Sequence, residues 1–247
     1  MSDTSLPESS KIDSRNRPLH RIFTAVPRRY DLINRLVTWC LDERWRLKAA
    51  QACLASHPHH LLDLCCGTGD LAIRLGRLVE GDIELVAIDY SQPMLALAAK
   101  KAKRSRVCRI AFIHADVANL PFPDGHFDSI GISFAFRNLT YKNPRTEGYL
   151  AEIVRILSTG GRFVCVETSQ PRSKVIRRLF HLYLRWFVYG VGRLISGNKT
   201  AYRYMAESAA RFHGPAQVNS MLRAAGFSAV RHRGFLLGAI GLYVALK

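Results

Sequence analysis

Short apolar runs alternate with amphipathic segments along most of the chain, at the periods typical of strands and helices. The apolar runs predict strands at 60–65, 83–89, 110–115, 127–133, 161–167 and 227–233, with a last apolar run at 236–246. Amphipathic segments between them predict helices at 69–78, 92–103, 144–157 and 215–225. Such alternation builds a parallel sheet with helices on both faces. We therefore expect an α/β fold with a seven-stranded sheet whose last strand is antiparallel.

Two further segments interrupt this alternation. Apolar positions over 28–55, with a break near Asp42, predict helices before the first strand, and we expect them to cap the edge of the sheet. Residues 171–212 predict a helical insertion before the sixth strand. Gly190 and Gly192 are expected to end the first helix of this insertion, because glycine is a poor helix former.

The composition fits one globular domain behind a polar tail. Residues 1–18, rich in Ser, Asp, Pro, Arg and Lys, predict a flexible tail, and 19–247 have the length of a single α/β domain. No run reaches the ~18 apolar residues that a membrane span needs, and the N-terminus lacks the apolar segment of a secretory signal. We therefore predict a cytoplasmic protein. None of the six cysteines forms a Cys-x-x-Cys pair or has a histidine at ligand spacing, so no metal site is predicted.

The stretch from Leu61 to Asp70 has the form of a buried strand that runs into a glycine-rich turn and then a helix. Gly67 and Gly69 lack Cβ atoms, which suits a place where a ligand must approach the backbone closely. In open α/β sheets such a unit binds nucleotide cofactors. A Walker loop is excluded because no Gly-Lys-Ser/Thr follows, whereas a dinucleotide site stays compatible with Gly67-x-Gly69-x-x-Ala72.

Carboxylates at the ends of the next two strands narrow the choice of nucleotide. Asp89 ends the second strand, 26 residues after Asp63, and can accept hydrogen bonds from both ribose hydroxyls. Asp116 follows the third strand and can accept a hydrogen bond from an adenine amino group. A glycine-rich turn and two acids fit an adenosyl ligand without a pyrophosphate. The spacing from Asp63 to Gly67 and Gly69 also matches S-adenosylmethionine enzymes better than dehydrogenases.

Positive charge is concentrated in the last third of the chain. The formal net charge is +17, and residues 168–247 contribute 13 Lys and Arg residues against one acid, Glu207. Basic positions from Lys174 to Arg185 recur at helical spacing beside an apolar, aromatic-rich stripe. Strong basicity favours either an anionic membrane surface or nucleic acid. A basic amphipathic helix fits a membrane interface, but it also fits stacking on RNA bases or simple packing on the domain.

Several sequence blocks occur in the order found in one methyltransferase family. They are Val26–Asn34, Leu62–Asp70, Asp116–Phe122 with Phe127-Asp128, Ile132–Asn138, and Tyr202–Ser208 with Arg211-Phe212. In these blocks the chain resembles the UbiE-type C-methyltransferases of ubiquinone and menaquinone biosynthesis, from about Phe23 to the C-terminus. The glycine-rich block is shared by many methyltransferases, whereas the opening, Arg137-Asn138 and Tyr202-x-Tyr204 blocks are more specific.

The resemblance implies a Rossmann-like class I methyltransferase fold with S-adenosylmethionine as the cofactor. Cofactor contacts are expected from the strand ends and the glycine-rich turn, namely Asp63, Gly67, Thr68, Gly69, Asp89, Asp116, Val117 and Ser133. The two glycines are expected to admit the methionine part of the ligand. Asp63 is expected to support the loop or to attract the amino group of the ligand.

The family also implies transfer of a methyl group to a ring carbon of a polyprenylated quinol, either demethylmenaquinol or 2-methoxy-6-polyprenyl-benzoquinol. The ring carbon becomes nucleophilic when a neighbouring hydroxyl loses its proton, so the site must align the reactants and favour the phenolate. Arg137 is a candidate to stabilise the phenolate, and Asp31 is a candidate to accept the proton. Tyr202 and Arg203 are further candidates. Structural pairing is the alternative interpretation for each of these residues.

The chain differs from the usual family sequence at two places, and these differences bear on the identity of the acceptor more than on the type of reaction. Ala135-Phe136 stands where Gly-Leu is usual in the family, and Thr168–Pro171 stands where Phe-Ser-Lys-Pro is usual. Both changes are expected near the acceptor pocket.

The acceptor implied by the resemblance favours an anionic membrane surface over nucleic acid as the partner of the basic segment. A polyprenylated quinol resides in the bilayer, so the basic insertion is interpreted as attraction to an anionic membrane surface, and peripheral membrane association is predicted. Nucleic acid is disfavoured because enzymes that methylate its amino groups usually carry an Asn/Asp-Pro-Pro-aromatic block, where this chain has Ser133–Phe136. An RNA or other small-molecule class I methyltransferase is the alternative. A non-catalytic binding protein is disfavoured because Asp89 and Asp116, the two acids expected to bind the cofactor, are both present. Whether the protein forms a homodimer is left open.

Overall fold

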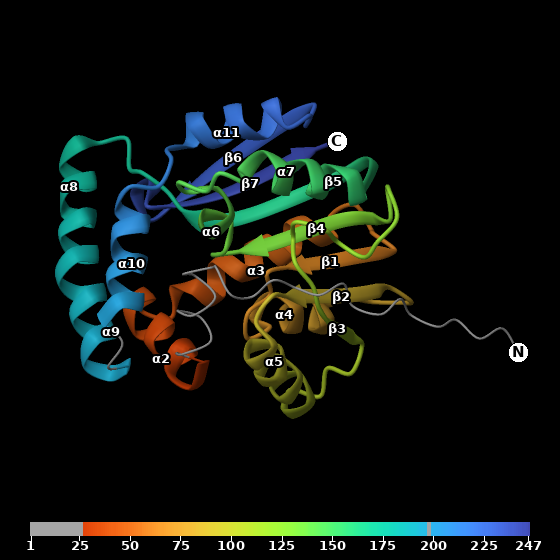
Figure 1. Ribbon diagram of the computed structural model, residues 1–247, viewed down its shortest axis with the longest axis horizontal. Coiled ribbons are helices and arrows are strands. Elements are labelled where there is room, and N and C mark those ends of the chain that lie inside the picture. Colours follow the sequence, from red (N-terminus) through yellow and green to blue (C-terminus); the bar gives the residue numbers. More distant parts are fainter. Residues whose placement is uncertain (1–26, 197–198) are drawn as a thin grey trace, which may run out of the picture.

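The computed structural model describes residues 27–196 and 199–247, and the tail predicted over 1–18 lies outside them. The described residues form a seven-stranded sheet in the order β3-β2-β1-β4-β5-β7-β6 (Figure 1). Its strands are β1 (His60–Leu64), β2 (Glu84–Asp89), β3 (Ile110–His114), β4 (Phe127–Ser133), β5 (Leu157–Thr168), β6 (Ala229–Phe235) and β7 (Ile240–Leu246). Neighbouring strands are parallel except at β7, which runs antiparallel to both β5 and β6. The predicted sheet with its antiparallel last strand is therefore confirmed.

The order of the strands reverses at β1, and this reversal positions the site. After β1 the chain moves outward to β2 and β3, and then returns to place β4 on the other side of β1. Leu61, Leu62 and Asp63 accordingly have a partner residue on each side. At such a reversal, ligands bind in the crevice outside the carboxyl ends of the strands.

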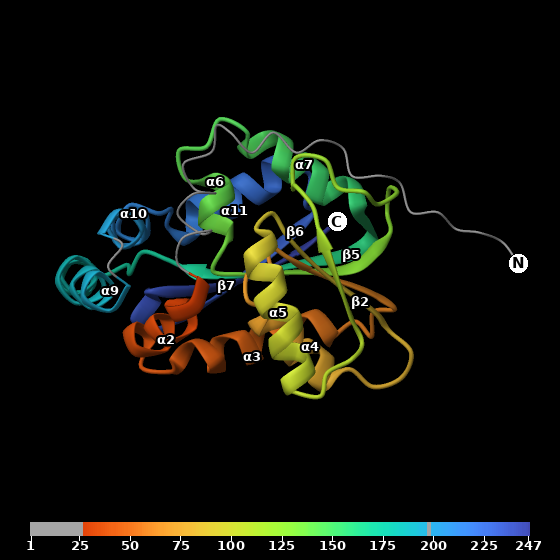
Figure 2. The same cartoon turned by 60° about the horizontal axis from the view of Figure 1, so that its bottom comes forward.

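Helices cover both faces of the sheet (Figure 2). One face carries α3 (Leu41–Leu54), α4 (Asp70–Leu78) and α5 (Gln92–Arg104), and the other carries α6 (Phe136–Thr140), α7 (Thr146–Ile156) and α11 (Pro215–Ala224). The short helix α6 is not predicted from the sequence, because five residues are too few to show a helical period.

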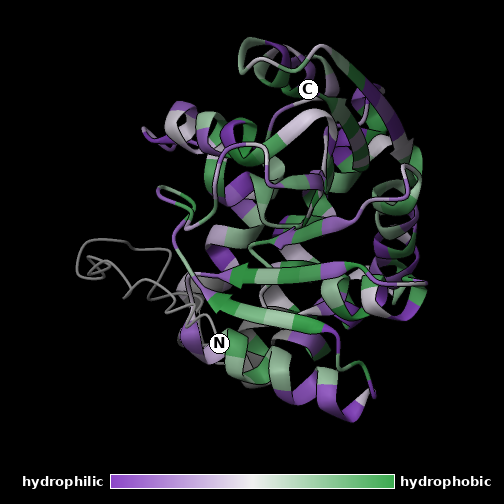
Figure 3. Ribbon diagram, turned by 90° about the vertical axis from the view of Figure 1, so that its right-hand side faces the viewer, coloured by the Kyte–Doolittle hydropathy of each residue, from purple (hydrophilic) through white to green (hydrophobic). Residues whose placement is uncertain are grey.

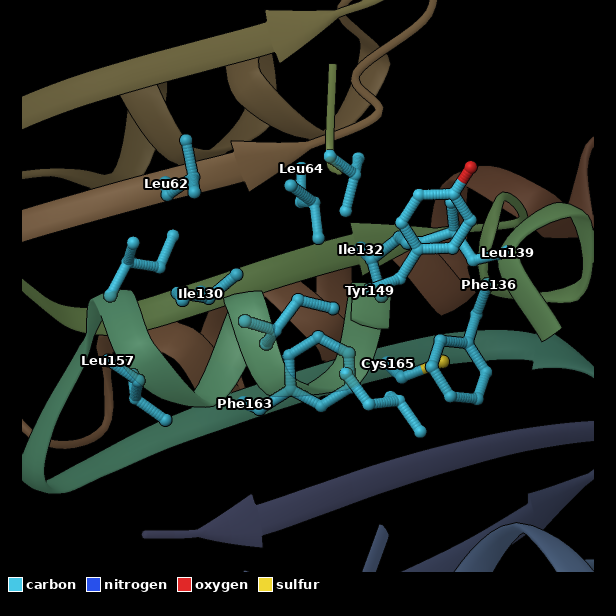
Figure 4. Close-up of a cluster of buried hydrophobic side chains, with 14 of the residues drawn as sticks. Leu62, Leu64, Ile130, Ile132, Phe136, Leu139, Tyr149, Leu157, Phe163 and Cys165 are labelled. Carbon is cyan, nitrogen blue, oxygen red and sulfur yellow. The ribbon is translucent and has the colours of Figure 1, made fainter. Parts of the chain in front are cut away.

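Alternate strand residues pack against the two helical layers. Leu61 of β1 lies in a buried cluster with Leu71 of α4. Leu62, its neighbour, points to the opposite face, where it shares a cluster with Ile130 and Phe163 beneath α7 (Figure 4). Each fully buried side chain of this kind contributes about 1.5–3 kcal/mol relative to exposure. The central strands are accordingly mostly apolar along their length, whereas the surrounding helices alternate polar and apolar residues (Figure 3).

The N-terminal helices take two different positions. Helix α3 covers a face of the sheet rather than its edge, because Trp45 and Cys53 pack against β4 and β5. Helix α2 (Pro27–Thr38) instead packs against the helical insertion beside the sheet. The break expected near Asp42 falls at Trp39 and Cys40, whose φ angles are +54° and +58°. An amphipathic pattern shows which side of a helix is buried, but not what covers that side.

The segment predicted as an insertion is helical. It contains α8 (Lys174–Tyr183), the π-helical turn η1 (Leu184–Val188), α9 (Tyr189–Ser196) and α10 (Lys199–Ala210). Among the described helices, none is both long enough and apolar enough to cross a membrane.

Gly190 and Gly192 do not end the first helix of the insertion, contrary to the prediction. Helical backbone continues through both glycines, from Lys174 to Ser196. Each glycine costs about 1 kcal/mol in a helix interior. Burial of side chains such as Leu184 against Ile33 of α2 offsets this cost, because each buried leucine contributes more than one glycine loses.

Candidate active site

A cavity of about 810 Å³ opens outside the carboxyl ends of β1, β2 and β4, where the strand order reverses. This volume lies within the range of ~300–1,000 Å³ found for small-molecule sites. One part of the wall comes from the strand ends and the glycine-rich turn. It includes seven of the eight predicted cofactor residues, namely Asp63, Gly67, Thr68, Asp89, Asp116, Val117 and Ser133. The other part comes from the segment between α6 and α7 and from α10.

The two glycines of the turn have different roles. Gly67 lines the cavity at a φ of +55°, and no atom lies within 4 Å of the position that a Cβ would take. The turn therefore presents bare backbone to the cavity at this residue. Gly69, at a φ of +79°, is not part of the cavity wall, and a Cβ there would stand 2.9 Å from the Cβ of Ala98 on α5. Gly69 thus permits close packing of the glycine-rich turn against α5 rather than close approach of a ligand.

Asp63 is buried beneath the glycine-rich turn. Its Oδ2 accepts a hydrogen bond of 2.8 Å from the backbone N–H of Ala72, which ties β1 to the first turn of α4. Its Oδ1 is buried and accepts no hydrogen bond from the described residues. Desolvation, followed by repulsion from Asp89, raises the pKa of Asp63 to about 8. A buried carboxylate oxygen without a donor marks a place where a cationic ligand group would gain a partner.

The raised pKa of Asp63 predicts that the ligand-free protein loses stability as pH rises. The unfolded chain releases this proton near pH 3.8, whereas the folded protein keeps it up to about pH 8. Folding therefore takes up a proton between these values. The free energy of unfolding is expected to fall across this window by an amount on the order of a few kcal/mol. Urea unfolding at several pH values checks this, and an undiminished slope in the Asp63→Asn variant would contradict it.

Asp89 ends β2, Asp116 follows the end of the neighbouring strand β3, and both line the cavity. Oδ2 of Asp89 accepts a hydrogen bond from the backbone N–H of Gly67, and Oδ1 accepts one from Ser91, both at 2.8 Å. Burial raises the pKa of Asp89. Oδ1 of Asp116 accepts a hydrogen bond of 3.0 Å from the backbone N–H of Ala118. Backbone donors thus fix the orientation of both carboxylates at the cavity wall.

Thr68 is anchored to α2 by a charged cluster. Its hydroxyl donates a hydrogen bond of 2.6 Å to Oδ1 of Asp31, and Nζ of Lys101 donates one of 2.6 Å to Oδ2 of the same carboxylate. Lys101 also forms an ion pair with Asp70 at the start of α4. Asp31 does not line the cavity. It joins α2 to the glycine-rich turn, so the structure favours its interpretation as a structural pair over that of a proton acceptor.

Arg137 lies outside the cavity wall in a buried ion pair. Its Nη1 donates hydrogen bonds to Oε1 of Glu167 at 2.7 Å and to Oγ1 of Thr168 at 2.9 Å. Its backbone N–H donates to Oε2 of Glu167 at 3.0 Å. The side chain of Arg137 is 6% exposed, and that of Glu167 is fully buried. This geometry favours structural pairing for Arg137 over contact with a phenolate.

Only one tyrosine of the Tyr202-x-Tyr204 block reaches the cavity. Tyr204 lines it, whereas Tyr202 is fully buried in the cluster that joins α2, η1 and α10. Arg203 is exposed and is not part of the wall. Successive residues of a helix turn by about 100°, so side chains two positions apart point in nearly opposite directions. Burial raises the pKa of the Tyr204 hydroxyl, and Arg137 is close enough to lower it partly.

Other cavity residues are not identified from the sequence. Arg46 of α3 donates a hydrogen bond of 3.1 Å to Oγ of Ser133, and its guanidinium lies 5.2 Å from the ring centroid of Phe134. Ion pairs with Asp42 and Asp70 hold Arg46 in this position. The wall opposite the strand ends includes Asn138, Leu139, Tyr141, Lys142, Tyr149, Tyr204, Glu207, Ser208 and Arg211. No motif marks Arg46, because its partner at the strand end follows 87 residues later.

Two cysteines also line the cavity, beside the glycine-rich turn. Burial raises the pKa of both Cys65 and Cys66 well above the usual value, and the nearby carboxylates raise it further. Both thiols therefore stay protonated at neutral pH. A protonated thiol is a poor nucleophile, which argues against thiol catalysis here.

Comparison with known proteins identifies the family. The model of the ubiE/COQ5 methyltransferase family matches residues 11–247. The chain is 40% identical to a demethylmenaquinone methyltransferase of Thermus thermophilus, over 90% of this chain and 98% of the relative. It is 37% identical to a protein of the same name in Deinococcus radiodurans, over 94% of each chain. It is 34% identical to a ubiquinone/menaquinone biosynthesis C-methyltransferase UbiE of Methylobacterium nodulans, over 90% of this chain and 87% of the relative.

Solved structures share the fold at lower sequence identity. A possible histamine N-methyltransferase of Thermotoga maritima, described as S-adenosylmethionine-dependent, matches with a TM-score of 0.57 and 20% identity, over 92% of this chain and 99% of that one. A similarly described methyltransferase of Aquifex aeolicus matches with a TM-score of 0.55 and 17% identity, over 76% and 81%. These structures confirm the class I methyltransferase fold. The family match over nearly the whole chain goes further, and shows that the chain belongs to the S-adenosylmethionine-dependent enzymes of the ubiE/COQ5 methyltransferase family.

Proposed function

We propose that this enzyme transfers a methyl group from S-adenosylmethionine to a ring carbon of a polyprenylated quinol, such as demethylmenaquinol, in respiratory quinone biosynthesis. The observation that carries the proposal is the two-part cavity, in which acidic strand ends line one part and aromatic side chains line the other. The names of the relatives at 34–40% identity support the choice of acceptor.

The strand-end part of the cavity fits S-adenosylmethionine. Oδ1 of Asp63 offers a buried acceptor for the amino group, and the bare backbone at Gly67 leaves room for the methionine part. Asp89 and Asp116 line the cavity with carboxylates, which can accept hydrogen bonds from the ribose hydroxyls and the adenine amino group. When bound, this cofactor supplies a methyl group on a positively charged sulfur.

The part of the cavity beneath α10 fits a quinol ring. Tyr141 and Tyr149 offer flat apolar surfaces, and Asn138 and Tyr204 offer polar groups. Because its pKa is raised, the Tyr204 hydroxyl keeps its proton and can donate a hydrogen bond to a ring oxygen. Such a donor stabilises the negative charge that develops when the quinol hydroxyl loses its proton. Glu207, an exposed carboxylate of the same wall, is placed to accept that proton.

Tyr204→Phe is expected to reduce kcat/KM for the quinol without changing cofactor affinity. The variant removes one hydrogen bond to the ring oxygen, which is worth about 0.5–1.5 kcal/mol, or roughly two- to tenfold in kcat/KM. Steady-state kinetics with the quinol and calorimetric titration with S-adenosylmethionine measure the two effects. An equal loss in both quantities would show that Tyr204 acts through the fold of the cavity rather than on the quinol.

Methyl transfer from radiolabelled S-adenosylmethionine tests the proposed reaction. Demethylmenaquinol, kept reduced in detergent, and bulk tRNA serve as parallel acceptors. Label in the quinol fraction is the expected result. Label in tRNA alone would overturn the quinol assignment and make the basic C-terminal third a surface for RNA.

A further inference from the structure

The outer face of the continuous helix formed by α8, η1 and α9 carries large apolar side chains in contact with solvent. Val175, Leu179, Leu182 and Trp186 follow one another at spacings of four, three and four residues, so they form one stripe. Their exposed fractions are 69%, 61%, 53% and 70%. This helix lies at the left edge of the molecule in Figure 1. An exposed apolar stripe of this size on a folded domain marks an interaction surface.

The fold does not need this stripe. The opposite side of the same helix is the one that packs, because Leu184 and Val188 are buried with Ile33 of α2 and Ala206 of α10. No described residue of α8 is itself buried. The helix is thus held in place from its inner side, and its outer stripe is left to contact something else.

Helix α2 extends the apolar surface. Trp39, directly after its last residue, is 73% exposed and stacks on Phe187 with ring centroids 6.2 Å apart. Phe187 stacks in turn on Tyr183, whose hydroxyl donates a hydrogen bond to the carbonyl of Val37. We call the stripe together with Trp39 and Phe187 the apolar patch.

Basic residues line one side of the apolar patch. Lys174, Arg178 and Arg185 are exposed and fall on a neighbouring line of the same helix. The sequence has no acidic residue between Glu167 and Glu207, so no carboxylate of this segment offsets these charges. An apolar stripe flanked by cations, with tryptophan at its margin, is the pattern of a helix that lies in a membrane interface.

We infer that the apolar patch, with Lys174, Arg178 and Arg185, docks the enzyme on an anionic phospholipid surface. RNA matches the positive charge but not the four apolar side chains. A second copy of the chain matches the apolar side chains, but it would bring like charges together. An anionic bilayer matches both, because acyl chains receive the apolar residues while phosphates receive the cations.

The position of the patch suits the proposed acceptor. Helix α10 packs on η1 and α9 along one side, and contributes Tyr204, Glu207 and Arg211 to the cavity on another. A docked enzyme therefore holds the acceptor part of its cavity one helix away from the bilayer. The inference rests on the proposed quinol methylation for its purpose, but its structural basis is independent of that reaction.

Vesicle flotation of the full chain tests the docking surface. Phosphatidylglycerol-containing vesicles are expected to bind the wild type, and pure phosphatidylcholine vesicles to bind it more weakly. Leu179→Glu combined with Trp186→Glu is expected to weaken binding by roughly tenfold or more. Leu78→Glu, which changes another exposed leucine, at the end of α4 and outside the apolar patch, is the control and is expected to bind like the wild type.

A second pair of variants tests the cations. Arg178→Gln with Arg185→Gln is expected to weaken binding roughly fivefold per arginine at low salt, and less at high salt. Lys103→Gln with Arg104→Gln removes the same charge from the exposed end of α5 and is expected to change binding little. Binding by the Leu179/Trp186 variant at the wild-type level would overturn the inference. A wild type that does not float, and that forms a dimer sensitive to the same two substitutions, would assign the patch to a second copy instead.

Activity on a short-tailed, water-soluble quinol separates the docking from the reaction. All the surface variants are expected to methylate this acceptor at the wild-type rate, and to differ only with a long-tailed quinol embedded in vesicles. Loss of activity on the soluble acceptor would show that the substitutions damage the fold, and would overturn the docking interpretation of the flotation result. Vesicle binding without any quinol methylation by the wild type would reject the proposed function while supporting the docking surface.

Discussion

Arg137→Met is expected to lower the free energy of unfolding by about 3–5 kcal/mol. The side chain of Glu167 is fully buried, and the guanidinium of Arg137 lies 2.7 Å from it as its partner of opposite charge. Removing that partner leaves a buried carboxylate without an opposite charge beside it, and this is more destabilising than the loss of the pair as a whole. Urea unfolding of the wild type and the variant measures the difference.

The double variant Arg137→Met with Glu167→Gln separates charge from packing. The neutral amide removes the unpaired charge. The double variant is therefore expected to lose less free energy of unfolding than the two single variants lose together. Some loss remains, because Glu167 also accepts hydrogen bonds from the backbone N–H groups of Arg137 and Thr168. Additive losses would show that the pair carries no coupling. Near-normal stability of Arg137→Met together with lost turnover would restore the phenolate role that the sequence pattern proposed for it.

Much of the fold can be predicted from the sequence because most strands are covered on both faces. A strand of this kind is a continuous apolar run, and β4 matches the predicted range of 127–133. The start of β5 is less visible. It begins at Leu157, four residues before the prediction, because its first residues form an irregular register with β4 around Phe127 and Ser129. Periodicity indicates regular pairing but does not indicate a register shift.

The cofactor part of the site follows from chain order alone. Residues at the carboxyl ends of parallel strands meet at one edge of the sheet, so Asp63, Asp89 and Asp116 come together without any knowledge of side-chain contacts. The other candidates depend on details that the sequence does not contain. Asp31 and Arg137 each fit both a catalytic role and an ion pair, and only their partners in space favour the second.

Asp89→Asn is expected to raise the dissociation constant of S-adenosylmethionine by about 100-fold. The carboxylate is fixed by the backbone N–H groups of Gly67 and Ser91, which aims its remaining lone pairs at the cavity. Hydrogen bonds to a charged acceptor are worth about 1.5–3 kcal/mol each, and the ribose offers two hydroxyl donors. The amide keeps the size of the side chain but loses the charge and one acceptor atom. Isothermal titration calorimetry with the cofactor measures the effect.

Glu84→Gln is the matched control for this prediction. It neutralises an exposed carboxylate at the opposite end of the same strand, where the only ion pairs within the described residues are long contacts with His60 and His126. Cofactor affinity within about twofold of the wild type is expected for it, because the charge lies a whole strand away from the cavity. If Asp89→Asn bound the cofactor as tightly as Glu84→Gln does, the ribose would have to be held elsewhere. Asp89 would then serve only to order the turn at Gly67. This outcome would contradict the assignment of the strand-end part of the cavity to the adenosyl group.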